Sequence, residues 1–235
     1  MIGVVTTAVL LLTWILWALS TLGCGLVCMQ LFREQRWRST AVEFRVALWI
    51  GVLVLVLATA FLHFLVPLGS GLSRVAAAGW FMLGLSCLVW RLTRGRSSPI
   101  RRCSRRPFSV EPYKLVVLML LLVSIISIGQ FAGSEPMDYD AGLYRMSLIN
   151  YAAEFRLIPG LANLHDRFGF GSSLSPVTAF LGNVLWGTNS FRVVSGFFLT
   201  LMLIEIALRV VPAGRRTPGD VLLVLAWGFS AWLIL

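Results

Sequence analysis

The residues of this 235-residue sequence best suited to chemistry are two aspartates, Asp138 and Asp140, which follow a long apolar run. A carboxylate held at a membrane surface beside a lipid-lined cavity can act as a general base on an acceptor hydroxyl. A structural interpretation stands beside this one, because Asp140 directly precedes a helical pattern and can cap the N–H groups of a helix start. Asp138 fits a solvated loop residue equally well. Capping and catalysis are compatible, so both interpretations of Asp140 stay open.

Four basic residues follow the aspartates: Arg145, Arg156, His165 and Arg167. Guanidinium groups pair bidentately with phosphate oxygens, and imidazole titrates near neutral pH. A lone loop histidine is often a hydrogen-bonded structural residue, and interfacial arginines also contact bulk lipid head groups. We assign Arg156 to bulk lipid and keep Arg145, His165 and Arg167 as candidates for binding a phosphate.

Two ionisable residues, His63 and Glu205, fall inside apolar runs, where such groups are costly and become functional candidates by default. His63 lies within about one helical turn of Pro67, so it can reach the membrane interface. Glu205 precedes Arg209 by four residues, which predicts a structural ion pair on one helix face. Cys24 and Cys28, one turn apart without histidine or carboxylate neighbours, are interpreted as small buried residues rather than metal ligands.

The elements that must position these residues are membrane helices. Apolar residues make up 58% of the chain, charged residues 13%, and the mean hydropathy is +0.85. Six apolar runs approach or exceed the roughly 20 residues that a helix needs to cross the hydrocarbon core, and they are continuous rather than alternating. The composition excludes a soluble globular enzyme, a secreted disulfide scaffold and a β-barrel porin. It predicts an all-α polytopic membrane protein with about six transmembrane helices.

The predicted organisation has three parts. Residues 1–133 hold four transmembrane helices, residues 134–190 form an extracytoplasmic loop of juxtamembrane helices, and residues 191–235 hold two more spans. The last run ends at Leu235 without a polar tail, a pattern typical of the N-terminal part of a longer polytopic chain. The predicted spans are Ile2 to Phe32, Val46 to Leu68, Val75 to Leu92, Leu115 to Phe131, Phe191 to Val211, and Asp220 to Leu235.

The basic residues predict the orientation of these spans. Fifteen of the 20 lie around residues 33–45, 91–114 and 209–216, and five lie elsewhere. Because basic loops stay in the cytoplasm, the N-terminus and residues 134–190 are predicted to face outward. We interpret the net charge of +10 as this topology signal rather than as nucleic-acid binding.

The outward loop is far longer than a link between spans requires, which indicates function. Tyr144, Leu148, Tyr151 and Phe155 recur at helical spacing and predict an amphipathic helix whose aromatic face lies flat in the membrane interface. A Pro-Gly break follows this helix. The apolar segment Pro176 to Trp186 is predicted to be interfacial or re-entrant, since a span there would reverse the basic-residue pattern.

The loop resembles the GT-C class of integral membrane glycosyltransferases. The resemblance rests on an Asp-x-x-x-Tyr pattern after a span, on the amphipathic helix and on the Pro-Gly break. It covers roughly residues 134 to 200 and is most similar to a bacterial group of multispanning GT-C-like proteins. The residues that carry it are Tyr139-Asp-Ala-Gly-Leu-Tyr-Arg145, Ile158-Pro-Gly-Leu-Ala-Asn-Leu-His165 and Phe170-Gly-Ser-Ser173.

The resemblance implies a glycosyltransferase of the bacterial plasma membrane that moves a sugar from a polyprenyl-phosphate donor to an acceptor hydroxyl on the extracytoplasmic face. Asp140 matches the catalytic aspartate of the class, with Asp138 second. Arg145, His165 and Arg167 become candidate ligands of the donor phosphate. Some members of the class use a divalent cation, Mg²⁺ or Mn²⁺, for which Asp138 and Asp140 are the candidate ligands.

Two other functions remain alternatives. One is a transporter or flippase of a lipid-linked substrate, which needs polar groups within several spans. The other is a non-catalytic membrane assembly partner. The expected partners are the lipid bilayer and a polyprenyl-linked sugar, and no nucleic acid.

Overall fold

The structure, a computed structural model, is entirely helical where it describes the chain, and it confirms an all-α polytopic membrane protein. Among the described residues, five helices are long and apolar enough to cross a membrane, and their bounds follow the predicted runs closely. The predicted run Asp220 to Leu235 lies outside the described residues. These are 2–31, 40–94, 112–134, 145–160, 163, 173–182, 186 and 190–210. The helices are α1 (Ile2–Leu31), α2 (Thr40–Leu65), α3 (Gly71–Arg94), α4 (Pro112–Gly133), α5 (Met146–Glu154), α6 (Leu174–Gly182) and α7 (Ser190–Val210).

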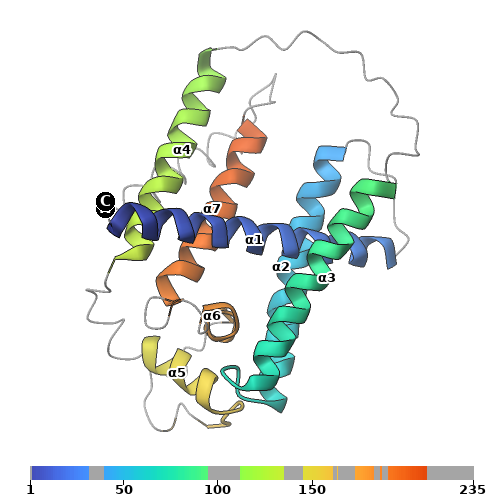
Figure 1. The fold of residues 1–235 in the computed structure, drawn as a ribbon, viewed down its shortest axis with the longest axis vertical. Coiled ribbons are helices and arrows are strands. Elements are labelled where there is room, and N and C mark those ends of the chain that lie inside the picture. The colour runs from blue at the N-terminus through green and yellow to red at the C-terminus, as the bar shows by residue number, and fades with distance from the viewer. Residues whose placement is uncertain are drawn as a thin grey trace.

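Four of the long helices run along the length of the molecule in alternating directions, as Figure 1 shows. The end where α2 stops at Leu65 and α7 starts at Ser190 also carries α5 and α6, and we call it the loop end. The opposite end, where α3 stops at Arg94 and α7 carries Arg209 in its last turn, is the basic end. From α2 to α7, the ends of successive long helices therefore alternate between the basic end and the loop end.

Helix α1 lies across the other four long helices (Figure 1), so its 30 residues are strongly inclined to them. Glycines make this crossing possible. A methyl group added at Gly23 would lie 1.8 Å from the carbonyl oxygen of Gly84 on α3, and one added at Gly25 would lie 1.7 Å from the carbonyl oxygen of Ala47 on α2. Small residues at a helix interface let backbones approach closely, which replaces the missing hydrophobic drive between helices in lipid.

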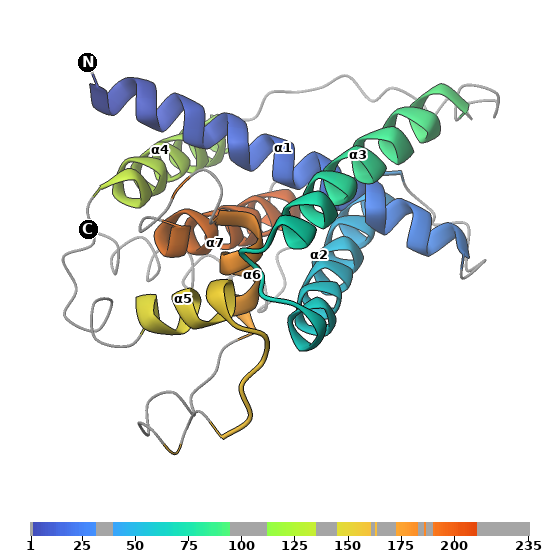
Figure 2. The ribbon, with the colours of Figure 1, turned by 60° about the horizontal axis from the view of Figure 1, so that its bottom comes forward.

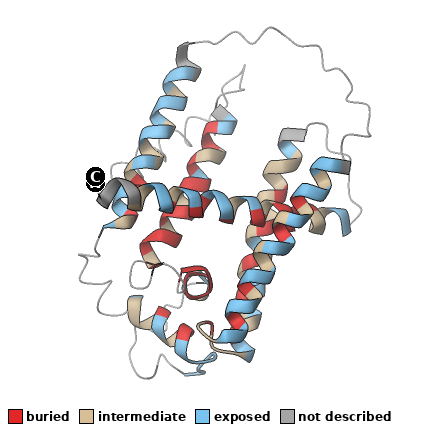
Figure 3. Cartoon of the chain, viewed as in Figure 1, coloured by how far each residue is buried: buried red, intermediate tan, exposed pale blue. Residues whose placement is uncertain are grey.

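The core is centred on α1, α7 and α6. Buried residues make up 56% of the apolar windows of α1 and α7, against 17% for α4. Phe197 of α7 is 1% exposed and packs edge-on against Trp17 of α1, with ring centroids 5.4 Å apart. The exposed residues of α2, α3 and α4, coloured pale blue in Figure 3, include many large apolar ones, as expected for helices whose solvent is lipid.

Helix α6 is buried by other helices of the protein. All its residues from Val177 to Gly182 are buried, and it contacts α2, α3, α5 and α7 (Figure 2). The interfacial or re-entrant placement of this segment in the membrane stays a prediction, and burial by other helices is compatible with a re-entrant segment. A methyl group added at Gly182 would lie 2.3 Å from Cβ of Ser190, so the end of α6 abuts the start of α7.

Helix α5 exists as predicted, and the structure adds the face by which it packs on the rest of the protein. Its buried residues are Ile149, Ala152 and Ala153, whereas Phe155 is 47% exposed. The reason is backbone hydrogen bonding: the N–H groups of Leu68 and Gly69 in the α2–α3 turn donate to the carbonyls of Ala152 and Ala153, at 2.9 and 2.8 Å. These bonds satisfy carbonyls at the helix end and require small side chains at the contact.

Candidate functional site

Most of the predicted site residues lie outside the described part of the chain. Asp138, Asp140, His165 and Arg167 all do, so their positions stay predictions. Arg145 is described and exposed. The structural information on the site therefore comes from Ser134 and Arg145, which flank the segment 135–144 that carries both aspartates.

The first end of this segment is held by a buried arginine. Arg192, in the first turn of α7, is 7% exposed, and its Nη1 donates a hydrogen bond of 2.9 Å to Oγ of Ser134. Its guanidinium carbon lies 4.5 Å from the centroid of the Phe131 ring on α4. A cation over an aromatic face contributes about 2 kcal/mol when both are desolvated, which offsets part of the cost of burial.

The second end is held by the neighbouring residue of α7. The guanidinium carbon of Arg145 lies 5.3 Å from the centroid of the Phe191 ring. Ser134 and Arg145 are thus the described residues on either side of the acidic segment. They contact Arg192 and Phe191, which are consecutive residues of α7. Both ends of the acidic segment are anchored at the loop end of the bundle.

The start of α7 is suited to an anionic group. Ser190 is 2% exposed, so the helix begins in a protein interior where its unpaired N–H groups and positive dipole end are little screened. Arg145 and Arg192 add two guanidinium groups beside it. Guanidinium groups and a helix start are the groups that proteins use to bind phosphate.

Arg192 was not among the site residues predicted from the sequence. It counted there only as one of the five basic residues outside the three basic loops. The available clue was an arginine directly after an aromatic residue at the outer end of a span. An arginine there either reaches water or is buried with partners, and the sequence pattern alone does not distinguish these cases.

His63 has a structural role at the loop end. It is 8% exposed, and its Nε2 lies 3.2 Å from the carbonyl oxygen of Phe155. The N–H of Leu157 donates to the His63 carbonyl at 2.9 Å. These bonds join the end of α2 to the chain after α5, and the position of His63 at the membrane interface stays a prediction.

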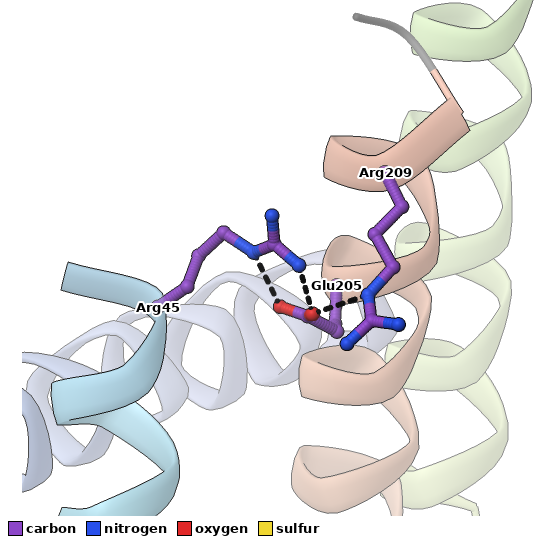
Figure 4. Close-up of polar contacts among 3 residues, drawn as sticks. All are labelled: Arg45, Glu205 and Arg209. Atoms are coloured by element: carbon purple, nitrogen blue, oxygen red, sulfur yellow. Dashed lines mark hydrogen bonds and ion pairs between the residues drawn. The ribbon is translucent and has the colours of Figure 1, made fainter. Parts of the chain in front are cut away.

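The predicted pair of Glu205 and Arg209 is confirmed, with Nε of Arg209 2.8 Å from Oε1 of Glu205. Arg45 of α2 joins it and binds both oxygens of the same carboxylate (Figure 4). This cluster lies at the basic end, whereas Ser134 and Arg145 contact the start of α7 at the loop end.

Metal binding stays untested at the predicted position. Among the described residues, no three His, Cys, Asp or Glu side chains come together as a metal site. The candidate ligands Asp138 and Asp140 are not among those residues.

Comparison with known proteins identifies a family but not an activity. No curated protein and no solved structure matches the chain. One family model matches residues 8–229, from the first turns of α1 to beyond the end of α7. The chain therefore belongs to the family described as a domain of unknown function (DUF8201).

Proposed function

We propose that this protein is a membrane glycosyltransferase that transfers a sugar from a polyprenyl-phosphate donor to an acceptor hydroxyl, on the extracytoplasmic face of a bacterial plasma membrane. The observation that carries the proposal is the anchoring of the acidic segment at both ends beside Arg145 and Arg192. The resemblance of residues 134–200 to GT-C glycosyltransferases supports it.

The carboxylates and the arginines suit the two parts of a sugar transfer, which are deprotonation of the acceptor hydroxyl and departure of the donor phosphate. The acceptor oxygen attacks the anomeric carbon while the bond from that carbon to the donor phosphate oxygen breaks. The electron pair of the broken bond leaves with the phosphate. Arg192 and Arg145 would stabilise the charge that grows on this leaving group. Asp140, with Asp138 as the second candidate, would take the proton of the acceptor hydroxyl as general base.

The position at the end of a helical bundle suits a lipid-linked donor. A polyprenyl chain stays among apolar side chains, while its phosphate and sugar need polar groups at the membrane surface. The loop end offers both, since the exposed apolar faces of α2, α3 and α4 lead to it. Partial exclusion of water there would strengthen each electrostatic contact with the phosphate.

The test of this function is the replacement of Asp140 by Asn. The wild-type protein and the variant are expressed in a strain that lacks the gene, and sugar released from labelled polyprenyl-phosphate sugars onto acceptors is measured in isolated membranes. The loss of a general base should lower transfer about 10²- to 10⁴-fold, without loss of folded protein. Asp138→Asn tests the second candidate, and a loss of transfer in this variant alone would assign the base to Asp138. Glu154→Gln, which changes an exposed carboxylate at the end of α5, is the matched control and should retain full activity.

Two results would contradict the assignment. Full transfer by both aspartate variants would show that neither Asp138 nor Asp140 is the general base. Absence of transfer by the wild-type protein with every donor offered, together with movement of the lipid-linked sugar across vesicle membranes, would favour the flippase alternative.

A further inference from the structure

A groove between α2 and α7 near the basic end lies outside the proposed catalytic site. Its volume is about 460 Å³. One wall is a face of α2, and the other holds charged residues of α7. Apolar and cationic groups therefore meet in one concave surface.

The charged part of the groove carries a net positive charge. Among the described residues that line the groove, Glu205 is the single carboxylate, and it pairs with both Arg45 and Arg209. Within this described lining, one of the two guanidinium charges thus stays uncompensated. Figure 4 shows that the third nitrogen of Arg45 points away from the carboxylate and that Arg209 binds it through Nε. The side chain of Arg209 is 53% exposed, and its Nε bond is its one hydrogen bond within the described part of the chain.

The apolar part of the groove extends through most of one leaflet. Beyond Arg45 it follows one face of α2 to Leu53 through Val46, Trp49 and Ile50. Eight residues of helix rise about 12 Å. Half of the hydrocarbon core measures about 15 Å. Arg45 lies at the basic end of this track, where a head group would be.

We propose that this groove binds an anionic diacyl phospholipid, with its phosphate on Arg45 and Arg209 and one acyl chain along α2. Basic pockets between membrane helices are known binding sites for anionic head groups. A zwitterionic head group would bring its own cation next to the uncompensated guanidinium, so the groove should favour a net negative lipid. This proposal is independent of the glycosyltransferase activity.

The experiment measures quenching of Trp49, which lines the groove and is 36% exposed. The purified full-length protein is reconstituted into phosphatidylcholine vesicles that contain brominated phosphatidylglycerol or brominated phosphatidylcholine. The difference between the wild-type protein and Trp49→Phe isolates the signal of this residue. Half-maximal quenching should need about fivefold less of the anionic lipid, the preference expected for one uncompensated arginine near a membrane surface.

Three variants make the result specific to the groove. Arg209→Gln should reduce the preference to about one, and Arg209→Lys should keep most of it. Arg91→Gln is the matched control, because Arg91 lies at the same end of the bundle but pairs with Glu43 at 2.8 Å, outside the groove. This variant should keep the full preference.

Three outcomes would overturn the proposal. Equal quenching by the two lipids would show a groove that takes bulk lipid without selection. Absence of Trp49 quenching by either lipid would show that protein, such as residues 211–235 of this chain, fills the groove. An equal loss of preference in Arg209→Gln and Arg91→Gln would assign it to general surface charge.

Discussion

Two arginines of α7 show how position decides what the same side chain does. Arg192 at the loop end is buried and is held by Ser134 and the Phe131 ring, while the Arg209 side chain at the basic end is 53% exposed and pairs with Glu205 one turn away. A buried guanidinium with fixed partners is rigid, so it can meet a phosphate with little loss of freedom on binding. Arg192 is therefore the stronger candidate for donor recognition.

Replacing Arg192 by alanine should raise the KM for the polyprenyl-phosphate donor about 10- to 100-fold, because hydrogen bonds to a charged group contribute about 1.5 to 3 kcal/mol. Arg192→Lys keeps the charge but loses the planar fork, so its KM should lie between the two. Arg74→Ala, an exposed arginine at the same end, is the control and should leave KM unchanged. An unchanged donor KM in Arg192→Ala would contradict a role in phosphate binding.

At the scale of the helices, the crossing of α1 over α2 and α3 depends on glycines, whose lack of a side chain lets the backbones approach closely. Gly84 on α3 faces the Ser20 backbone so closely that an added methyl group would lie 2.1 Å from the carbonyl oxygen. Gly79, five positions earlier on the same helix, has open space around it. The two glycines provide a matched pair within one helix.

Gly84→Ala should destabilise the protein by about 1 to 3 kcal/mol, because the helices must separate to admit the methyl group. Gly79→Ala should be neutral or stabilise by up to about 1 kcal/mol through helix propensity. Thermal unfolding of the purified variants in one detergent, followed by circular dichroism, measures both. Equal midpoints would mean that α1 does not lie against α3 at Gly84.

The helices themselves were predictable from sequence, whereas their partners were not. Long continuous apolar runs define a span without reference to any other segment, and the pair of Glu205 and Arg209 lies within one helix turn. Arg45 joins that pair across 160 positions of sequence, which no local pattern contains. The protein-facing side of α5 was not predictable for a related reason: it depends on backbone bonds from a distant turn to Ala152 and Ala153.

The candidate site was predictable only in part. Local composition was enough to select the acidic segment and Arg145. The anchoring of that segment by Arg192 depends on α4 and α7 lying side by side, which is a property of the assembled bundle. The contact of His63 with the Phe155 carbonyl likewise joins residues 92 positions apart.

At the scale of the whole molecule, the two ends of the bundle should face opposite sides of the membrane. The basic end carries Arg91, Arg45 and Arg209, and the positive-inside rule assigns it to the cytoplasm. A cysteine introduced at Ser172 in a variant without other cysteines should react with an impermeant thiol reagent added to intact cells. Native Cys103, kept as the single cysteine, should react only after the cells are opened. The reverse labelling pattern would contradict the predicted orientation, and with it the proposed catalytic site on the extracytoplasmic face.

The hydrogen bond from the Trp14 indole to the Val193 carbonyl, 2.9 Å long, joins residues 179 positions apart. At a synthesis rate of about 5 to 20 residues per second, Val193 is made roughly 9 to 36 s after Trp14. Gly23 and Gly25 of α1 can pack against α3 and α2 early in that interval. Trp14 can form its hydrogen bond only after Val193 of α7 has been made. An indole N–H without a partner is costly in hydrocarbon, so water at the interface or an insertion factor has to satisfy it until then. Helix α1 is thus made well before α7 but completes its packing only with it, so one face of α1 is open to misassembly in the interval.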